Sequence, residues 1–352
     1  MMELAIISFT ENGSRLCRSL TELLPGSGYS CEGYAIPKYA GRYGLAEPGM
    51  PLKEWAGRMF ETKDAILFIS ASGIAVRAIA PWVKDKMTDP AVVVMDERGI
   101  FAISLLSGHL GGANELAGVL ANLTGAIPVI TTATDVNGRF AVDIFAKKNR
   151  MHISDRKAAK AVSADILDEK PVGLYCEFPV TGEIPEELTV VGSSDPFEGK
   201  TGIVISLNCE KRPFGQTLHL HPRIVTVGIG CRKGTDAGVL EEAVLDALQV
   251  NHISIESVEQ AASIDLKAEE QAITAFCEKY ELPFRTFTAE ELRETKGDFT
   301  PSDFVKQVTG VENVCERSAV QGSGGGRLIQ KKKAGNGVTV AIALRDWSVD
   351  FG

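Results

Sequence analysis

The sequence predicts an α/β protein in three parts: a mostly parallel, open-sheet (Rossmann-like) domain over 1–138, a small α+β middle domain over 139–222 and an α/β domain over 223–352. Two observations indicate this fold class. In the first third, short apolar runs alternate with amphipathic stretches, as in a parallel sheet covered by helices. Near residue 137 the pattern changes to short strands separated by Pro and Gly, and a new strand–helix unit begins at 224. The length of 352 residues also exceeds one ordinary core.

In the first domain, buried strands are predicted at 4–9 and 65–71, each followed by a helix: 12–24, capped by Asn12, and 72–83, opened by Ser72. Residues 91–107 predict two strands with a turn at 97–99. The stretch 107–125 becomes helical in its second half and ends on Gly125, and 127–135 predicts a strand that ends in polar residues.

The remaining two domains have a similar mixture of elements. A basic helix at 155–162 precedes predicted strands at 173–178, 188–193 and 202–207. The last domain is predicted to contain a strand at 224–230, helices at 239–248, 269–281 and 301–309, a strand at 283–287 and a hairpin at 327–344. The hairpin is expected to turn at Asn336-Gly337, the usual pair for a two-residue loop.

Composition limits the classes of function. The net charge of −9 and pI near 5.3 argue against a nucleic-acid-binding protein, which needs a basic face, but still allow a polyanionic small substrate. No apolar run approaches the ~20 residues that cross a bilayer, and the N-terminus lacks the pattern of a signal peptide. The seven cysteines are scattered without a CxxC pair, which is typical of a reducing cytoplasm. We therefore expect a cytoplasmic protein without membrane or nucleic-acid partners.

The segment SGHLGGANE, residues 107–115, carries the strongest chemical signal. Small residues between a strand and a helix let backbone N–H groups approach a ligand or a developing oxyanion. His109 lies inside this turn and can serve as a general base or a metal ligand. Alternatively, the glycines only form a tight turn and His109 caps a carbonyl group. The other candidates in this segment are Gly108, Gly111, Gly112, Asn114 and Glu115.

Two further strand ends carry polar residues. SASGIAVR, residues 70–77, offers Ser72 and Arg77, although the pattern alone favours a capped helix with a surface arginine. TTATDVNGR, residues 131–139, offers Thr132, Asp135 and Arg139 at the carboxyl end of a strand, where open α/β sheets bind ligands; an ordinary Asx-turn is the alternative.

In the last domain, GIGCRKGT (228–235) superficially resembles a dinucleotide-binding loop, but its spacing is GxGxxxG. An anion-binding turn that uses Arg232 and Lys233 is more plausible, with a solvated basic loop as the alternative. The run KKK at 331–333 is predicted to be the solvated face of an edge hairpin. His219 and His221 face one side of a strand, and the sequence offers no third ligand that would make them a metal site.

The same segments carry a family resemblance. LFISASGIAVRAIAPWVKDK, VVVMDERGIFAISLLSGHLGGANELA and PVITTATDVNGRFAVD closely resemble the amino-terminal domain of the cobalt-precorrin-5A hydrolase family of anaerobic cobalamin biosynthesis. TVGIGCRKGT, CERSA (315–319) and LIQKKKAGNGVTVAIAL resemble its carboxy-terminal domain, which also occurs as a free-standing protein. Residues 139–222 resemble the variable linker domain of the family more weakly.

The resemblance implies a reaction on a cobalt-containing tetrapyrrole. Water opens the lactone of the ring A acetate, and the methylated bridging carbon leaves as acetaldehyde, which gives cobalt-precorrin-5B. This chemistry needs a base for water, donors for the oxyanion and a group that moves protons.

On this basis we expect His109 to be the base or proton shuttle, with Glu115 assisting it. Gly108, Gly111 and Gly112 would supply backbone donors, and Asp135 and Thr132 would orient water. Substrate contacts are expected from Ser72, Arg77, Asn114, Arg139, Arg232 and Lys233. The cobalt belongs to the substrate, and no protein-bound cofactor or metal is implied, although His109 as a transient axial cobalt ligand stays open.

Two rival functions remain. A protein that only binds corrinoid intermediates and hands them to neighbouring pathway enzymes would bind a tetrapyrrole without releasing acetaldehyde. A nucleotide-dependent enzyme would be stabilised by NAD or ATP, but the sequence lacks GxGxxG and P-loop patterns.

Overall fold

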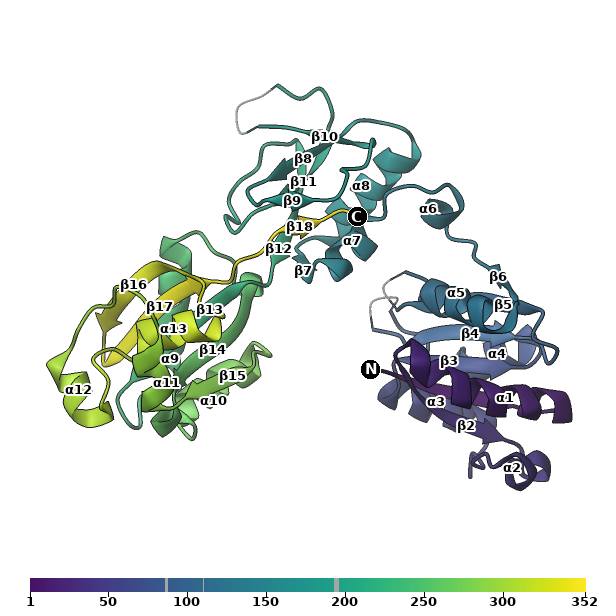
Figure 1. Cartoon of the computed structure of the whole chain (residues 1–352). Coiled ribbons are helices and arrows are strands. Elements are labelled where there is room, and N and C mark those ends of the chain that lie inside the picture. Colours follow the sequence, from purple (N-terminus) through teal and green to yellow (C-terminus); the bar gives the residue numbers. More distant parts are fainter. Residues whose placement is uncertain (86–87, 110, 193–195) are drawn as a thin grey trace. The chain divides into compact units, whose positions relative to one another are not determined.

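The computed structural model describes residues 1–85, 88–109, 111–192 and 196–352. The chain divides into two compact units, Met1–Ile144 and Phe145–Gly352, and Figure 1 labels their elements. Each unit is mixed α/β, as the sequence predicted. The three predicted domain boundaries stay a prediction.

The first unit is built on one six-stranded sheet. In spatial order its strands are β2 (Tyr29–Ala35), β1 (Met2–Ser8), β3 (Ala65–Ile69), β4 (Ala91–Met95), β5 (Phe101–Leu106) and β6 (Ile127–Val129). The first four strands in this order are parallel. Strand β5 runs antiparallel to β4 because a tight turn joins the two, and β6 is parallel to β5. The carboxyl ends of β5 and β6 therefore lie at the opposite edge of the sheet from those of the other four strands.

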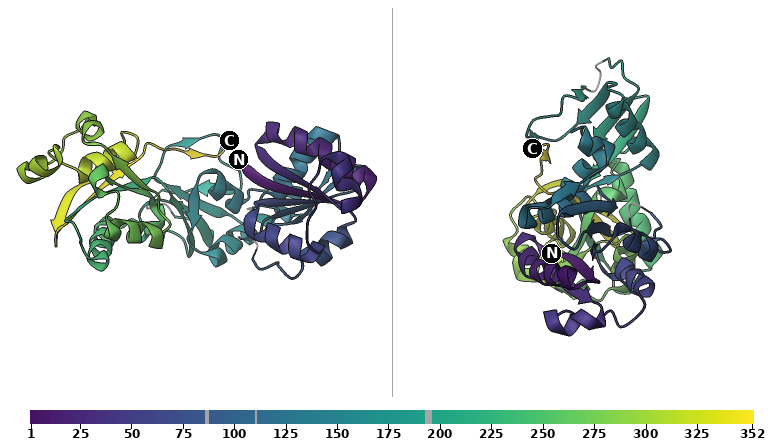
Figure 2. Two further views of the ribbon diagram at one scale, coloured as in Figure 1. Left: turned by 90° about the horizontal axis from the view of Figure 1, so that it is seen from below. Right: turned by 90° about the vertical axis from the view of Figure 1, so that its right-hand side faces the viewer.

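Helices cover both faces of this sheet (Figure 2, left). They are α1 (Glu11–Leu23), which a 3₁₀ turn at Leu24–Ser27 follows, α2 (Pro37–Tyr43), α3 (Leu52–Thr62), α4 (Ser72–Ile79) and α5 (Ala113–Thr124). The short helix α6 (Ala133–Val136) comes after β6 in the chain. Side chains of β1 alternate between two cores: Leu4 and Ile6 pack with α1, α2 and α5, whereas Ala5 and Ile7 pack with α3 and α4.

Three local predictions in this unit need correction. The cap of α1 is Thr10, whose hydroxyl accepts from the Gly13 amide, and not Asn12. Helix α4 ends at Ile79, before the predicted residue 83, since Pro81 disfavours continuation. The strand predicted at 127–135 stops at Val129, and the polar residues after it form the short helix α6.

The second unit contains two five-stranded sheets. The first has the order β10 (Leu188–Val190), β8 (Val172–Cys176), β11 (Thr201–Ile205), β12 (Gln216–Pro222) and β7 (Met151–Ile153), with only β7 antiparallel. Residue 193, the last of the strand predicted at 188–193, lies outside the described residues. Helix α7 (Val142–Lys148), whose first three residues belong to the first unit, precedes β7, and Asp155 caps α8 (Arg156–Leu167).

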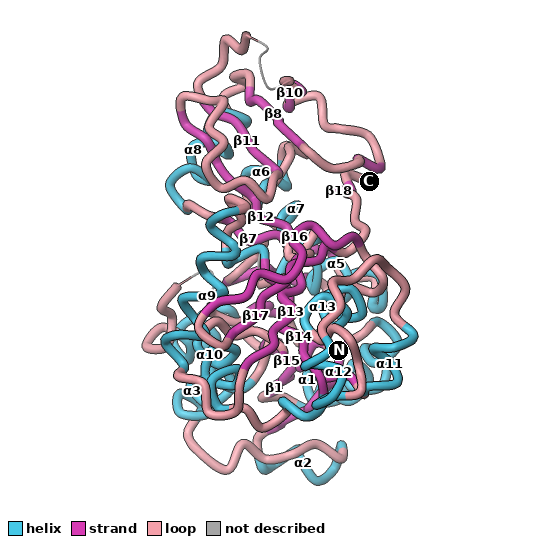
Figure 3. The backbone as a smooth tube through the Cα atoms, turned by 90° about the vertical axis from the view of Figure 1, so that its left-hand side faces the viewer, coloured by secondary structure: helices cyan, strands magenta, loops and turns pink. Residues whose placement is uncertain are grey.

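The last sheet has the order β15 (Phe284–Phe287), β14 (Val258–Ile264), β13 (Val225–Cys231), β17 (Val338–Leu344) and β16 (Arg327–Gly335). Figure 3 shows these strands between two helical layers. One layer is α9 (Ala237–Val250) and α10 (Gln271–Lys279); the other includes α11 (Ala289–Glu294), α12 (Asp303–Thr309) and α13 (Cys315–Gly322). Short 3₁₀ turns at Ile255–Ser257 and Asp265–Lys267 flank β14.

Two details link this sheet to the sequence. The predicted turn at Asn336-Gly337 joins β16 to β17, and both residues have positive φ, 49° and 82°, as a type I′ hairpin requires. The final strand, β18 (Val349–Asp350), pairs in parallel with β9 (Val180–Thr181), so the end of the chain returns to the first part of this unit. Among the described residues, no helix is long and apolar enough to span a membrane.

Candidate active site

The loop between β5 and α5, which contains His109, lies where β5 and β6 end. Leu106 at the end of β5 pairs with Val92 at the beginning of β4, and β6 runs beside β5 in the same direction. The polar residues after β6 therefore arrive at the same edge as His109. This shared edge brings together two segments that are more than 20 residues apart.

The loop has a constrained backbone. Ser107 has a φ of 56° and Gly112 a φ of 89°, and the amides of Ala113 and Asn114 turn back to the carbonyls of Ser107 and Gly108. A Cβ atom on Gly111 would lie 2.3 Å from the Cβ of Ser107, so this position cannot carry a side chain without a shift of the loop. Leu110, within the same motif, lies outside the described residues.

His109 lies between two carboxylates. Its Nε2 is 2.5 Å from Oδ2 of Asp135 and 3.0 Å from the hydroxyl of Thr134. Its Nδ1 is 3.4 Å from Oδ2 of Asp143, the second residue of α7. The side chains of His109 and Asp143 are 19% and 21% exposed, so solvent reaches the group but screens it only partly.

Asp135 is held by several donors at one oxygen. Its Oδ2 accepts from Nδ2 of Asn114 at 3.1 Å and from the Thr132 hydroxyl, in addition to its contact with His109. Asn114 also donates to Thr132 at 2.9 Å. Oδ1 of Asn114 is buried without a hydrogen-bond partner in the described part of the chain, and so is the hydroxyl of Ser107. Two polar atoms beside this turn are thus buried without a partner among the described residues.

The charges of this group favour a protonated histidine. The hydrogen bond to Asp143 is the largest influence on His109 and raises its pKa above 6.5; burial opposes this, and Asp135 raises the pKa further. Burial tends to raise the pKa of Asp143, but the hydrogen bond and the positive charge of His109 outweigh it, and the net shift is downward. His109 therefore holds an imidazolium at pH values where an isolated histidine is largely neutral.

The predicted residues Thr132, Asp135 and Asn114 lie together with His109, whereas Glu115 does not. Glu115 is exposed on α5 and makes no hydrogen bond to His109. Its charge instead adds to burial in raising the pKa of Tyr29, the first residue of β2.

Of the three predicted backbone donors, one amide is already hydrogen-bonded within the loop and two are not. The Gly112 amide donates to the carbonyl of His109 at 3.0 Å and is not available to an oxyanion in this conformation. Within the described residues, the amides of Gly108 and Gly111 have no such acceptor.

Ser72 and Arg77 lie at the other edge of the sheet. They follow β3, whose last residue, Ile69, pairs with Met95, and Met95 in turn pairs with Ala102 near the beginning of β5. All three polar segments were predicted to follow strands, but the reversal of β5 separates this one from the other two. The turn at 97–99 was predicted, but its consequence for these strand ends was not.

The remaining predicted residues are placed as follows. The Arg139 amide donates to the Thr134 carbonyl, which puts Arg139 directly after α6. Arg232 and Lys233 belong to the second unit and follow β13. Within the described ranges, no three His, Cys, Asp or Glu side chains are arranged to bind a metal ion.

Asp143 and Thr134 were not among the site residues predicted from the sequence. Both lie in the quoted segment PVITTATDVNGRFAVD, and Asp143 is an acidic residue in the first turn of a helix, a position that usually needs no functional explanation. The available signal was its presence in a segment that carries the family resemblance.

The chain is similar to known proteins of cobalamin biosynthesis along nearly its whole length. The chain matches the families described as Cobalamin synthesis G N-terminal over 54–135, Cobalamin biosynthesis central region over 140–222 and Cobalamin synthesis G C-terminus over 225–343. It is 35% identical to the cobalt-precorrin-5A hydrolase of Salmonella typhimurium, with 97% of each chain covered. It is 31% identical to that of Priestia megaterium, covering 97% of this chain and 94% of the relative. A solved structure of a cobalamin biosynthesis protein G homolog from Sulfolobus solfataricus aligns over 97% of each chain at 23% identity, with a TM-score of 0.42.

Proposed function

The chain belongs to the cobalt-precorrin-5A hydrolase family, and on that premise we propose that it opens the ring A lactone of cobalt-precorrin-5A with water and releases acetaldehyde. The single observation that supports a catalytic role for the first unit is the placement of His109 between Asp135 and Asp143. A half-buried histidine with a carboxylate on each nitrogen can hold and release a proton at neutral pH.

The proposed reaction has two stages. Water adds to the lactone carbonyl, and the tetrahedral intermediate collapses to a carboxylate and an alcohol on the bridging carbon. The alcohol then loses its proton, its C–O bond becomes a carbonyl, and the bond between this carbon and the macrocycle breaks. The electron pair of that bond passes to the macrocycle, which takes up a proton, and acetaldehyde leaves. The overall balance consumes one water and needs no oxidant or reductant.

We assign His109 the role of proton shuttle. As an imidazolium it donates a proton to the lactone oxygen that leaves at the first stage, and as the resulting neutral imidazole it accepts the alcohol proton at the second. Asp143 supports this role because it keeps the pKa of His109 above 6.5. Once His109 has delivered its proton it is neutral, and the second stage then has the base that it needs.

Asp135 is proposed to orient and deprotonate the attacking water. Its Oδ2 is occupied by His109, Asn114 and Thr132, while Oδ1 has no hydrogen bond within the described residues. The free oxygen can accept from water while the other anchors the carboxylate. We assign the oxyanion to the amides of Gly108 and Gly111, which have no acceptor in the described part of the chain.

A substrate carboxylate is proposed to meet Arg139, which directly follows the site. Arginine offers two parallel hydrogen bonds to a carboxylate. The cobalt arrives with the substrate, and the proposal assigns no cofactor to the protein.

The test is an anaerobic incubation of the full chain with cobalt-precorrin-5A in H₂¹⁸O, in which volatile aldehyde is trapped and the corrinoid is weighed. We expect acetaldehyde in step with the loss of a two-carbon unit from the corrinoid, and one ¹⁸O in its new carboxylate. His109→Gln should slow release by about 10²-fold or more, the usual contribution of a general acid–base group. Glu97→Gln, in the turn between β4 and β5, is the matched control and should retain activity.

Three outcomes would overturn the proposal or its parts. Binding of unchanged corrinoid without acetaldehyde would favour the carrier function. Acetaldehyde without ¹⁸O in the corrinoid would exclude attack of water on the lactone carbonyl. Full activity of His109→Gln would remove the shuttle role while leaving the reaction in place.

A further inference from the structure

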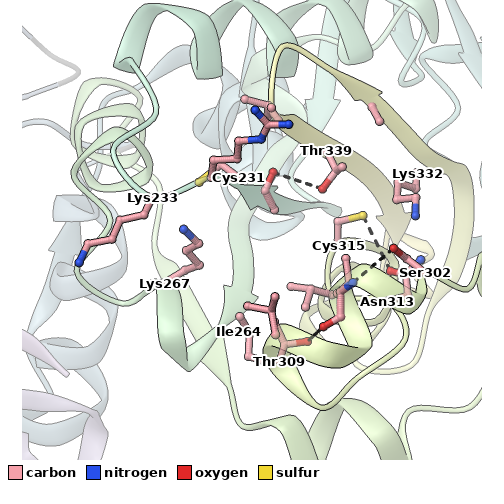
Figure 4. A pocket seen from close by; sticks show the side chains of 18 of the residues that line it. Cys231, Lys233, Ile264, Lys267, Ser302, Thr309, Asn313, Cys315, Lys332 and Thr339 are labelled. Carbon is pink, nitrogen blue, oxygen red and sulfur yellow. Dashed lines mark hydrogen bonds between the residues drawn. The ribbon is translucent and has the colours of Figure 1, made fainter.

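The second unit contains a large cavity that the reaction described above does not use. Its volume is about 730 Å³, and it lies between the loop after β13, helix α12 and the hairpin of β16 and β17 (Figure 4). All residues that line it fall within 230–339. A ligand can therefore bind here without any residue of the first unit, in a volume typical of small-molecule sites.

The cavity is positively charged, although the chain as a whole carries a net charge of −9. Among the described residues, its lining includes Arg232, Lys233, Lys267 and Lys332, but no Asp or Glu. Lys267 is paired with Glu270 at 2.8 Å. The other three cations have no ion pair within the described residues. Figure 4 shows Lys332 on one side of the cavity and Lys233 and Lys267 on the other. This distribution suits a ligand with several separated negative charges.

The position of Lys332 is set by the fold. The backbone amide of Lys332 donates to Oε1 of Glu316 at 2.7 Å, and Oε2 of this fully buried carboxylate accepts from the Thr300 amide at 2.8 Å. This clamp ties β16 to α13. Lys331, the residue before Lys332, does not line the cavity and pairs with Asp298. The run of three lysines is thus not a uniformly solvated face, since Lys332 lines the cavity.

The cavity also has an apolar wall. Ile264, Val305, Val308, Val314 and Val338 line it. Val308 is 63% exposed, although Val305 of the same short helix is partly buried against the cluster that contains Ile264. Solvent-exposed valine beside unpaired cations matches a ligand with an apolar body and charged groups at its rim.

We propose that this cavity is a corrinoid-binding site of the second unit. It would hold the peripheral carboxylates of a tetrapyrrole on Arg232, Lys233 and Lys332, and the apolar ring against Val305 and Val308. The choice of a tetrapyrrole over another amphipathic anion rests on the proposed function. Such a site can retain an unstable macrocycle before or after the reaction at His109.

The first test titrates the full chain with dicyanocobyrinic acid, a corrin with free carboxylates whose axial cobalt positions are occupied by cyanide. Cyanide prevents coordination by histidine or cysteine, so binding reports on the carboxylates and the ring. The heptamethyl ester of the same corrin retains the ring but has no negative carboxylates, and it should bind at least tenfold more weakly. Equal binding of acid and ester would refute recognition of the carboxylates.

The second test compares adjacent lysines. Lys332→Glu should raise the Kd for dicyanocobyrinic acid by about tenfold, because it replaces an attractive charge in the cavity by a repulsive one. Lys331→Glu makes the same change in charge outside the cavity and should change the Kd less than about twofold. Equal losses in both variants would mean that general surface charge, and not the cavity, binds the corrin.

A third pair of variants does not depend on the hairpin. Val308→Asp places a negative charge on an exposed lining residue and should also weaken binding about tenfold. Val250→Asp is its control, since Val250 is 64% exposed near the end of α9 and does not line the cavity. If the Lys332→Glu variant fails to fold, the Val308→Asp and Val250→Asp variants are sufficient to test binding at the cavity. Unchanged binding by Val308→Asp would overturn the proposal.

The outcomes remain separate from those of the hydrolase assay. Acetaldehyde release with cavity-independent corrin binding would refute only this inference. Cavity-dependent binding without acetaldehyde would refute only the proposed reaction. Competition by ATP or NAD at lower concentration than the corrin would assign the cavity to a nucleotide, against our proposal.

Discussion

The charge of Asp143 provides the sharpest test of the proposed site, since no local sequence pattern pointed to this residue. Asp143→Asn keeps the size of the side chain but removes its negative charge from Nδ1 of His109. We expect the pKa of His109 to fall, because its largest stabilising partner becomes neutral. Asp135 remains on Nε2, so the fall should be partial.

The magnitude follows from the geometry. Two unit charges 3.4 Å apart interact by roughly 5 kcal/mol at an effective dielectric constant of about 20, an upper bound before desolvation. Hydrogen bonds to charged groups contribute about 1.5–3 kcal/mol net, and 1.36 kcal/mol corresponds to one pKa unit. The distance is long for a hydrogen bond, and both side chains are about one-fifth exposed, which favours the lower end. We therefore expect a decrease of about one pKa unit.

The assay is the pH dependence of kcat/KM for acetaldehyde release, which reports ionisations of the free enzyme. If His109 must carry a proton, activity falls as pH rises through its pKa, and Asp143→Asn moves this alkaline limb down by about one unit. Long-range ¹H–¹⁵N spectra of the imidazole rings give the same pKa without turnover. Glu97→Gln, which removes a carboxylate at the opposite edge of the sheet, should leave the limb in place.

One result would refute the proposed effect of Asp143 on the protonation of His109. A limb that stays at its original pH in Asp143→Asn, with the rate merely scaled, would show that Asp143 does not control the protonation of His109. The stability of the folded state offers an independent sign check. Because the pKa of His109 is raised in the fold, its stabilising contribution is complete below pH 6.5 and lost as pH rises through the folded pKa. Asp143→Asn should therefore cost more stability at pH 6 than at alkaline pH.

Three further predictions concern stability and the two edges of the first sheet. Burial lowers the pKa of His221 to about 4, so as the pH falls the unfolded state takes up a proton before the folded state does. Urea titrations should therefore show up to about 3 kcal/mol of folding stability lost between pH 6.5 and 4. A flat profile, or the same profile in His221→Gln, would contradict this. Gly228→Ala should lower folding stability by about 3 kcal/mol or more, because its Cβ would lie 1.9 Å from the Cys315 carbonyl oxygen. Gly335→Ala, with open space around it, should lower stability by less than about 0.5 kcal/mol. Similar urea midpoints for the two variants would argue against close packing of α13 on β13. Arg77→Ala should change kcat/KM less than about threefold because Arg77 lies at the edge away from His109, and a tenfold loss would show that the substrate reaches both edges.

Local patterns in the sequence predicted most of the secondary structure. Apolar runs and glycine or proline punctuation located the strands and helices that were predicted, and the Asn336-Gly337 pair predicted its turn correctly. Several elements were not predicted, among them β2, α3, β14 and α13. The errors occurred where several polar side chains compete for one backbone amide, as at Thr10 and Asn12, or where a short strand is followed by a polar helix, as after Val129. These choices depend on which contacts the rest of the fold makes possible.

What the sequence determined by itself was the family, the α/β class and His109 as the residue around which the candidate site is built. Its grouping of Asn114, Thr132 and Asp135 as candidates was also consistent with their meeting at one edge. Only the tertiary structure placed Asp143 on the second nitrogen of His109, removed Glu115 from that group and turned Lys332 toward a cavity. The physical reason is that a local pattern specifies a strand, whereas the edge at which the strand ends depends on its direction in the sheet. That edge is set by pairing between residues distant along the chain, as the parallel pairing of β6 with the reversed strand β5 demonstrates.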